Sequence, residues 1–558
     1  MENKEIAQTL RLLSQLMELH QENPFKIKSV ANAAFQIDKL PFSISNKSLN
    51  EIDQIAGLGK SIATKVLELV QTKHLKELDE LIKKTPEGII EMLQIKGIGP
   101  KKIYTIWKDL AIENCGELYY ACNENRLIEA KGFGLKTQET IKKAIEFRIA
   151  NSGYFLYAKI EPFAEALIIK LQEVWPKASV FLVGDYRRRC EIIDSLTILT
   201  TNPSSPLVVD QLKNIDLNII TQSDSKLETK SANGLKITII HCSASQLGWN
   251  LILHTGNETH VKNLNQLLTG KTHTGKTEEE IYHLVGLPFI EPELREGLNE
   301  ITIARRTNKH NLIELKDLQG SLHNHSTWSD GVHTLEEMAL FCRDELKLSY
   351  LGICDHSKSA FYANGLSEIR VKAQHQEIDA LNKKLAPFHI FKGIESDILF
   401  DGSLDYADEI LQTFDFVVAS IHSVLKMDEQ KATERLIKAI ENPYTTILGH
   451  LTGRLLLSRS AYPINHQKVI DACAANQVVI EINANPLRLD LDWRWHQYAI
   501  EKGVILSINP DAHRTTGLFD MRYGILVARK GGVSATNCLN TKSLKEISAF
   551  FTNRKKIN

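Results

Sequence analysis

The spacing of apolar residues changes twice along the chain. Over residues 1–150 apolar positions recur with the period of an α-helix, as in IAQTLRLLSQLMEL and IATKVLELV. Residues 151–300 contain short apolar runs that predict strands, namely SVFLVG, LTILTT, KITIIHC and LGWNLILHTG. From residue 318 onward, short apolar runs alternate with helical segments. The pattern predicts a helical region, then an α+β region, then an α/β region.

Seven apolar runs divide residues 318–558. They are LQGSLHNHS, YLGICDH, HIFKGIE, FDFVVASIH, TTILGH, QVVIEINAN and GVILSINPDAH. Helical segments such as TLEEMALFCRDEL and NHQKVIDACAAN separate them. Strands that alternate with helices lie parallel, and a repeated series of them predicts a (β/α) barrel. In such barrels the functional side chains gather at the carboxyl ends of the strands.

Histidine and carboxylate residues end six of these seven runs. Imidazole together with carboxylate suits Zn²⁺, Mn²⁺ or Fe²⁺. Nine ligands exceed the needs of one ion, so we expect two or three divalent metals, with Glu395 as a candidate bridging carboxylate. The predicted metal ligands, which together form the predicted catalytic site, are His323, His325, Asp330, His356, Glu395, His422, His450, Asp511 and His513.

Three Gly-x-Gly loops, at residues 56–60, 96–102 and 131–136, punctuate the helical region. Glycine allows backbone angles closed to other residues, and the free amides that begin the next helix favour a phosphate group. Such a loop holds the DNA backbone without reading bases, and the three loops resemble helix-hairpin-helix motifs. The predicted DNA-binding residues are Gly57, Gly59, Lys60, Gly97, Gly99, Lys101, Lys102, Gly132, Gly134 and Lys136.

Residues 151–300 resemble the palm and thumb of a family X DNA polymerase. Residues 183–198 carry the palm resemblance, and TGKTEEEIYHLVGLPFIEPELREG is similar to the end of the thumb. The family has Gly-Ser, two arginines and three aspartates that hold two Mg²⁺ ions. The positions that match this polymerase site, in degenerate form, are Gly184, Asp185, Arg187, Arg188, Ser195, Thr197 and Thr238.

The departures from this motif predict an inactive polymerase half. Hydroxyl groups are poor ligands for Mg²⁺, so we expect no Mg²⁺ at the palm. Neither Asp194 nor Glu191 is expected to substitute, because a shift of one residue turns a strand side chain to the opposite face. Asp185 adds negative charge where the triphosphate would sit, and the thumb is shortened near residues 268–278.

Residues 318–558 closely resemble the PHP (polymerase and histidinol phosphatase) domain, a seven-stranded barrel with a trinuclear metal site. All nine ligand positions match, and the resemblance implies phosphoesterase chemistry. Lys358, Arg454 and Asn483 lie just beyond strand ends and are candidate phosphate contacts. Asp355 is expected to fix the tautomer of a ligand histidine. With the palm and thumb, this resemblance identifies the chain as the bacterial two-part form of family X.

These patterns define the predicted fold class, which is multidomain α+β and α/β. It combines a helix-hairpin-helix region, a nucleotidyltransferase-like palm with a short thumb, and a distorted seven-stranded (β/α) barrel. The predicted parts are a helical domain with the first hairpin (1–80), a fingers-like region with two hairpins (81–150), a degenerate palm (151–245), a thumb (246–300), a linker (301–317) and the PHP barrel (318–558).

Composition narrows the setting of the protein. The formal net charge is -1, so DNA binding must come from local basic patches. No apolar run is long enough for a membrane span, and the polar start MENKEIAQTL does not match a secretory signal. The eight cysteines form no CxxC pair, which fits a reducing cytoplasm. We therefore expect a cytoplasmic protein, monomeric by default, that contacts no membrane.

The favoured function is a metal-dependent phosphoesterase that processes 3′ ends of gapped or nicked DNA in repair. The reactions left open are 3′–5′ exonuclease, 3′-phosphatase or phosphodiesterase, and abasic-site cleavage. One alternative is an active gap-filling polymerase with a PHP exonuclease, which the missing carboxylates oppose. Another is a small-molecule phosphatase of the histidinol-phosphatase type, which the three hairpins oppose. A non-catalytic DNA-binding scaffold is the last, and the nine ligands oppose it.

Overall fold

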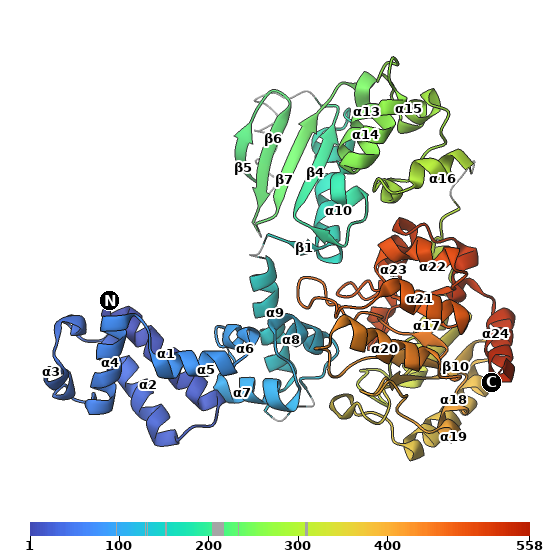
Figure 1. Ribbon diagram of the computed structural model, residues 1–558. Coiled ribbons are helices and arrows are strands. Elements are labelled where there is room, and N and C mark those ends of the chain that lie inside the picture. Colours follow the sequence, from blue (N-terminus) through green and yellow to red (C-terminus); the bar gives the residue numbers. More distant parts are fainter. Residues whose placement is uncertain are drawn as a thin grey trace. The chain divides into compact units, whose positions relative to one another are not determined.

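The computed structural model describes residues 1–95, 97–128, 130, 132–150, 153–202, 217–232, 234–306 and 311–557 (Figure 1). Parts of the predicted palm (151–152, 203–216 and 233) and of the predicted linker (307–310) lie outside these residues. The chain forms two compact units, Met1–Phe147 and Arg148–Asn558. None of the helices in the described part of the chain is long and apolar enough to cross a membrane.

The first unit is helical, as its periodicity predicts. In α1 the buried residues Ile6, Leu10, Leu13 and Met17 follow helical spacing and form one apolar face. Asn23 caps α2, whose first residue is Pro24, a common arrangement at a helix start. The helices are α1 (Asn3–Leu19), α2 (Pro24–Asp38), α3 (Leu49–Asp53), α4 (Lys60–Thr72), α5 (Lys76–Lys84), α6 (Glu87–Met92), α7 (Pro100–Tyr104), α8 (Cys115–Asn123) and α9 (Leu135–Ala150).

The second unit begins with a five-stranded sheet in the order β2-β4-β7-β6-β5. Its strands are β2 (Val180–Val183), β4 (Ser195–Thr200), β5 (Leu217–Gln222), β6 (Lys226–Ser231) and β7 (Lys236–His241), beside a short pair formed by β1 (Phe155–Leu156) and β3 (Ile192–Ile193). The helices of this part are α10 (Tyr157–Val174), α11 (Gly184–Arg187), α13 (Leu247–Thr255), α14 (Glu258–Leu267), α15 (Glu278–Leu284) and α16 (Glu300–Arg306).

One strand prediction is wrong, because LGWNLILHTG forms helix α13. Its buried residues are Gly248, Leu251, Ile252 and Thr255, which follow the helical spacing i, i+3, i+4, i+7. A Cβ at Gly248 would lie 2.1 Å from the Thr277 carbonyl oxygen, so only glycine lets this helix approach the segment before α15. Apolar composition alone could not separate a short buried helix from a strand.

The barrel prediction is confirmed by seven parallel strands in the order β14-β13-β12-β11-β10-β9-β8. The strands are β8 (Gly320–Ser321), β9 (Tyr350–Ile353), β10 (His389–Asp397), β11 (Phe416–Ser420), β12 (Ile447–Leu448), β13 (Val479–Asn483) and β14 (Leu506–Asn509). The two edges nearly close, since the segments after β8 and β14 meet where the His325 amide donates to the Ala512 carbonyl at 2.9 Å.

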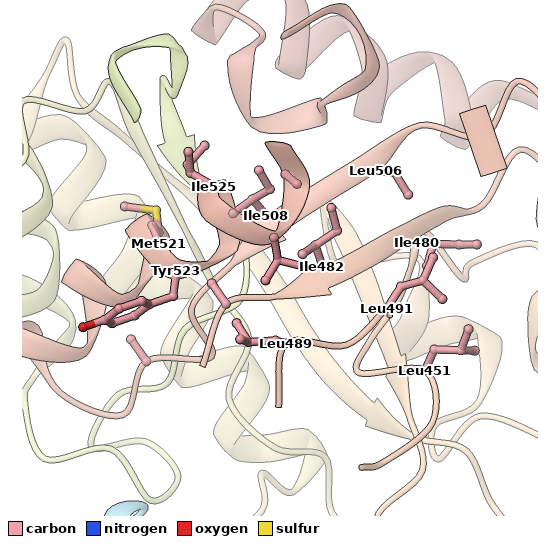
Figure 2. Packing of buried hydrophobic residues seen from close by; sticks show 14 of the residues in the cluster. Leu451, Ile480, Ile482, Leu489, Leu491, Leu506, Ile508, Met521, Tyr523 and Ile525 are labelled. Atoms are coloured by element: carbon pink, nitrogen blue, oxygen red, sulfur yellow. The ribbon is translucent and has the colours of Figure 1, made fainter. Parts of the chain in front are cut away.

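Helices connect and surround these strands. They are α17 (Leu335–Asp344), α18 (Glu368–Leu385), α19 (Asp408–Leu411), α20 (Glu429–Ile440), α21 (His466–Ala475), α22 (His496–Glu501), α23 (Met521–Lys530) and α24 (Leu544–Ile557). Figure 2 shows part of the resulting core, where Ile482 and Ile508 of the sheet pack near Met521 and Ile525 of α23. The same continuous core includes Leu196 and other residues of the five-stranded sheet, so palm and barrel share one apolar interior.

Aromatic and aliphatic side chains fill the interior of the barrel below the strand ends. Phe416 stacks on Phe551 of α24 with ring centroids 5.0 Å apart. Gly393 of β10 pairs with Phe416 of β11. A Cβ at Gly393 would lie 2.5 Å from the Phe416 ring and 2.6 Å from Cys354 Sγ. The apolar floor therefore has no space left at this layer, and Glu395 lies two residues further along the same face of the strand.

The Gly393→Ala variant is expected to lower the free energy of unfolding by about 1–3 kcal/mol, because one methyl group overpacks the barrel interior. Scanning calorimetry of the full chain measures the change as a lower midpoint of the barrel transition. Gly134→Ala is the matched control, since a Cβ there meets nothing within 4 Å. Equal midpoints for the two variants would contradict the prediction.

Candidate functional site

The structure brings all nine predicted ligand side chains together at the carboxyl ends of the barrel strands. They follow or end β8, β9, β10, β11, β12 and β14, and every one except His422 is buried. Three groups have ligand atoms within 4.8 Å of one another. The groups are His325, Asp330, His356 and His513; His323, His325 and Asp511; and His356, Glu395 and His422.

The Glu395 carboxylate lies between these groups. Its Oε1 is 3.3 Å from His323 Nε2, 3.2 Å from His422 Nε2 and 3.0 Å from His450 Nε2. Its Oε2 is 2.9 Å from His356 Nδ1 and 3.7 Å from His325 Nε2. Because the two oxygens face different sets of imidazoles, this carboxylate has the arrangement of a bridge between cation sites.

The donor set fits divalent cations. Several buried ligand atoms make no hydrogen bond within the described chain, among them His323 Nε2, His325 Nδ1, Asp330 Oδ2 and Glu395 Oε2. A buried polar atom without a partner costs about 1–3 kcal/mol, so a cation that binds these atoms would stabilise the cluster. Imidazole and carboxylate ligands suit Zn²⁺, Mn²⁺ or Fe²⁺.

Two carboxylates that sequence reasoning missed orient the ligand histidines. Glu481 is fully buried in β13, and its Oε1 lies 2.7 Å from His323 Nδ1. Its other oxygen accepts the His450 backbone amide at 2.8 Å. Asp397 Oδ1 lies 2.6 Å from His422 Nδ1. Such partners leave Nε2 of each ring facing the cluster. The sequence held two signals of these partners. Asp397 lies two residues after Glu395, and Glu481 is a carboxylate inside the apolar run of β13.

Among the described residues, Asp355 forms no hydrogen bond or ion pair with a ligand histidine, so the expected tautomer-fixing role is not observed. Its carboxylate accepts hydrogen bonds from the Ser326 amide at 2.8 Å, from the Ser329 hydroxyl at 2.5 Å and from Gln374 at 2.6 Å. Asp355 therefore fixes the loop between His325 and Asp330. Tertiary contacts, which sequence position does not reveal, decide this role.

The candidate phosphate contacts have different surroundings. Asn483 is fully buried and donates to Glu481 and to Asp511, both at 3.2 Å. Arg454 donates to the Arg488 carbonyl at 2.9 Å and to Asp492 at 2.6 Å. Protein groups therefore hold these two side chains, and a phosphate contact by either of them stays a prediction. Lys358 remains partly exposed, with a distant ion pair to Glu368 at 3.4 Å.

Neighbouring charges set the pKa of each group in the cluster. Burial alone would lower the pKa of His323, but Glu481, Asp511 and Glu395 outweigh it and raise the pKa well above its usual range. Burial also lowers the pKa of His422, but Glu395 and Asp397, which face this ring, outweigh burial and raise the pKa to about 9. His356 also has a raised pKa, since Asp330 and Glu395 outweigh burial.

The three palm positions that match the family's aspartates lie on two paired strands and carry hydroxyl groups, and Ser195 donates to the Asp194 carboxylate at 2.8 Å. Thr197 of β4 pairs with Thr238 of β7, and Ser195 lies two residues earlier on the same face. Asp194 is exposed just before the strand. Gly184 starts α11 with a φ of +67°. Three hydroxyls therefore stand where the family resemblance implies three aspartates.

Thumb carboxylates neutralise the two arginines of this motif. Arg187 makes a two-pronged contact with Glu278, at 2.9 and 2.5 Å. Arg188 lies 2.9 Å from Glu296 and 2.5 Å from Asp185. Both guanidinium groups are thus engaged within the protein, in the place where a triphosphate would need their charge.

The three Gly-x-Gly loops share one backbone form. Each first glycine has positive φ, +84° at Gly57, +99° at Gly97 and +90° at Gly132, which favours glycine. The second glycines are Gly59, Gly99 and Gly134, and a Cβ at any of them would meet nothing within 4 Å. Packing therefore does not require the second glycine, and each loop presents an open backbone at a helix start.

Basic residues accompany these loops. Lys60, Lys101 and Lys136 are exposed in the first turn of the helix that follows each loop. Lys102 Nζ lies 5.6 Å from the centre of the Phe133 ring, so the second and third hairpins adjoin. Open amides and ammonium groups at helix starts are the features that hold a phosphate backbone.

Metal binding is expected to release protons and to tighten as pH rises. In the metal-free cluster the raised pKa values keep His323, His356 and His422 protonated near neutral pH. A cation needs the same nitrogen lone pairs, so the affinity should rise about tenfold per pH unit for each displaced proton. Calorimetric Mn²⁺ titration of metal-depleted protein between about pH 6 and about pH 8 measures this. A pH-independent Kd would contradict the prediction.

Comparisons with known proteins agree with this architecture. A helix-hairpin-helix domain model matches residues 1–75, a SAM-like helix-hairpin-helix tandem model matches residues 89–146, and a DNA polymerase beta thumb model matches residues 257–296. A probable phosphatase of Thermoanaerobacter sp. (strain X514) is 29% identical over 29% of the chain and 69% of its own length. A probable phosphatase of Acetivibrio thermocellus is 27% identical over 37% of the chain and 84% of its own length.

A relative that matches along the whole chain gives the family. The DNA polymerase/3′-5′ exonuclease PolX of Bacillus subtilis (strain 168) is 33% identical over 573 aligned residues, which cover 99% of each protein. The helical region and the thumb also match family models, and the structure adds a seven-stranded barrel. The chain therefore belongs to family X of the DNA polymerases, in its PolX form, with a barrel that resembles PHP phosphatases.

Proposed function

We propose that the barrel is a metal-dependent phosphoesterase that processes DNA 3′ ends, and that the polymerase half does not extend DNA. The observation that supports this most is the buried cluster of nine histidines and carboxylates around Glu395, with ligand atoms that make no hydrogen bond. When bound, two or three ions of Zn²⁺, Mn²⁺ or Fe²⁺ supply an activated water and neutralise phosphate charge.

The residues of the chain hold and orient this centre. His325, Asp330, His356 and His513 would hold one ion. A second ion would be held by His323 and Asp511, and a third by His422 and His450. Each of these pairs would share a further ligand, either one from the first set or Glu395. Glu481 and Asp397 keep ring nitrogens directed at the site. Lys358, five residues beyond the end of β9, is the candidate that contacts the scissile phosphate.

The three hairpins would bind the DNA backbone. Their open glycine amides and exposed lysines suit phosphate groups of any sequence. This observation favours a DNA substrate, such as a gapped or nicked duplex, over a small phosphomonoester. The phosphatase relatives favour 3′-phosphate removal as one reaction of the site.

We infer that the polymerase half is inactive from the charged groups at its site. Ser195, Thr197 and Thr238 offer no carboxylate to Mg²⁺. Glu278 and Glu296 occupy the arginines that would bind a triphosphate. Together these contacts leave the palm without the means to gather two divalent ions and a nucleotide.

The His323→Ala/His325→Ala double variant is expected to lose at least about 100-fold of the hydrolytic rate, because two ligands leave the centre. The test incubates 5′-labelled gapped DNA that ends in a 3′ hydroxyl or a 3′ phosphate with Mn²⁺, with and without dNTPs. Shortening or dephosphorylation without extension is the expected result for the native chain.

His283→Ala, at an exposed histidine of α15, is the control and should retain the native rate. Template-dependent extension by the native chain would show that the palm is active. Hydrolysis that survives in the double variant would refute the barrel as its source.

The Gly99→Val variant is expected to weaken DNA binding on the order of tenfold, the loss of about one charged hydrogen bond. The valine side chain would stand in open space beside the backbone amides and would hold a phosphate away. Fluorescence anisotropy with labelled duplexes of two unrelated sequences measures Kd, and both should weaken equally. An unchanged Kd, with an unchanged melting midpoint, would remove this hairpin from the DNA-binding surface.

A further inference from the structure

Acidic residues of the palm and thumb face basic residues of the barrel. Glu161 Oε2 lies 2.8 Å from Arg522 and 2.9 Å from the Tyr523 hydroxyl. Glu293 lies 2.6 Å from Arg529. Two further ion pairs of the same kind join Glu296 with Lys530, and Glu191 with Arg454 at 3.6 Å. In these four ion pairs the carboxylate belongs to the polymerase half and the cation to the barrel.

Helix α23 carries most of these cations. Arg522, Tyr523, Arg529 and Lys530 all lie within Met521–Lys530, and Arg522 and Arg529 are one heptad apart on the same face. The opposite face packs closely on the barrel, because a Cβ at Gly524 would lie 2.6 Å from both Ala484 and Ile508. The segment before this helix carries Asp511 and His513, so its docking also constrains those two side chains.

Arg454 links the palm to a second segment near the metal centre. Its guanidinium contacts Glu191 of the palm, donates to the carbonyls of Arg488 and Leu489, and pairs with Asp492. Side-chain exposure at this pair is 13% for Arg454 and 11% for Glu191. Water screens such a contact only partly, so the Glu191 charge acts on Arg454, which keeps Asp492 and two carbonyls as further partners.

The segment held by Arg454, residues 484–491, folds back on strand β13. The backbone N–H of Asn483 donates to the Asp490 carbonyl at 2.6 Å, and the backbone N–H of Leu491 donates to the Glu481 carbonyl at 3.0 Å. Within the segment, Arg488 Nε lies 3.8 Å from Asp511 Oδ2. Figure 2 shows Leu489 of the same segment near Ile482 and Ile508. The chain of contacts therefore runs from Glu191 through Arg454 to the neighbours of Asp511, His323 and His450.

We propose that the degenerate palm serves as a scaffold for the metal centre, and that Glu191 and Arg454 are its positioning pair. Glu191 holds Arg454, Arg454 fixes residues 484–491, and this segment sets the position of Arg488 beside Asp511 and of Asn483 between Glu481 and Asp511. The polymerase half is then needed for hydrolysis although it does not extend DNA. This inference rests on the proposed phosphoesterase function.

The test uses the full chain with Glu191→Gln, which removes the palm charge and keeps a similar shape. Glu173→Gln, an exposed carboxylate on α10, is the matched control. For Glu191→Gln we expect kcat for hydrolysis to fall roughly threefold to tenfold, as coupling through packed contacts implies, with KM for DNA unchanged. The melting midpoint should match that of the control, since no core residue changes.

The second measurement is a Mn²⁺ titration of metal-depleted protein, followed by electron paramagnetic resonance. The Glu191→Gln variant should bind its weakest Mn²⁺ roughly threefold to tenfold less tightly than the control does. Arg454→Lys, which keeps the charge but not the fork, should show the same direction. Native kcat and native Mn²⁺ affinity in Glu191→Gln would overturn the proposal, and so would losses that appear only with a lowered midpoint.

The two proposals fail in different ways. If the native chain hydrolyses no DNA, the proposed function fails, while the Mn²⁺ titration still decides whether Glu191 positions the centre. If the native chain hydrolyses DNA and Glu191→Gln is indistinguishable from Glu173→Gln in both measurements, only the positioning role fails.

Discussion

A single buried carboxylate, that of Glu395, connects the imidazoles at the top of the barrel. It is 1% exposed, so water cannot stabilise its charge, and the histidines on both of its oxygens hold its pKa well below the usual range against the effect of burial. Two of these histidines also face other carboxylates, His356 facing Asp330 and His325 facing Asp511. The cluster therefore balances charge as a unit, and its donor set suits divalent cations, which would bind the ligand atoms that make no hydrogen bond in the described chain.

The layers around this carboxylate have separate tasks. Below it, Gly393 leaves just enough space for Phe416, which makes the floor apolar and rigid. Beside it, Glu481 and Asp397 bind the far nitrogens of His323 and His422 and so fix ring orientation. A buried network of this kind is stable only when each member has a partner. The dense packing beneath it is what holds those partners within hydrogen-bond distance.

In the palm and thumb region, carboxylates of the protein itself pair with the two arginines of the family motif. Thr197 and Thr238 pair across the sheet, at two positions that match aspartates of the family motif. Glu278 and Glu296 satisfy the arginines, and Glu296 also contacts Lys530 of the barrel. Palm and barrel form one continuous apolar core. The polymerase half is thus physically part of the unit that contains the histidine and carboxylate cluster, and fold alone does not assign it an activity.

The sequence by itself determined the features that depend on neighbouring residues. Helical periodicity, the seven alternating runs and the glycine loops are local, since backbone geometry repeats over a few residues. The ligand set gathered as expected because parallel strands bring their carboxyl ends to one face. Local composition predicted the wrong element where a helix and a strand can have the same composition, as in the apolar run that forms α13.

Only the tertiary structure decided which charges meet. Glu481 lies 158 residues from His323, and nothing in the apolar run around it indicates that contact. Arg454 and Asn483 have residue types suited to phosphate, yet carboxylates and carbonyls hold both. The reason is physical: an ionic or hydrogen-bonding partner is set by distance in space, whereas sequence spacing fixes distance only within one helix or strand.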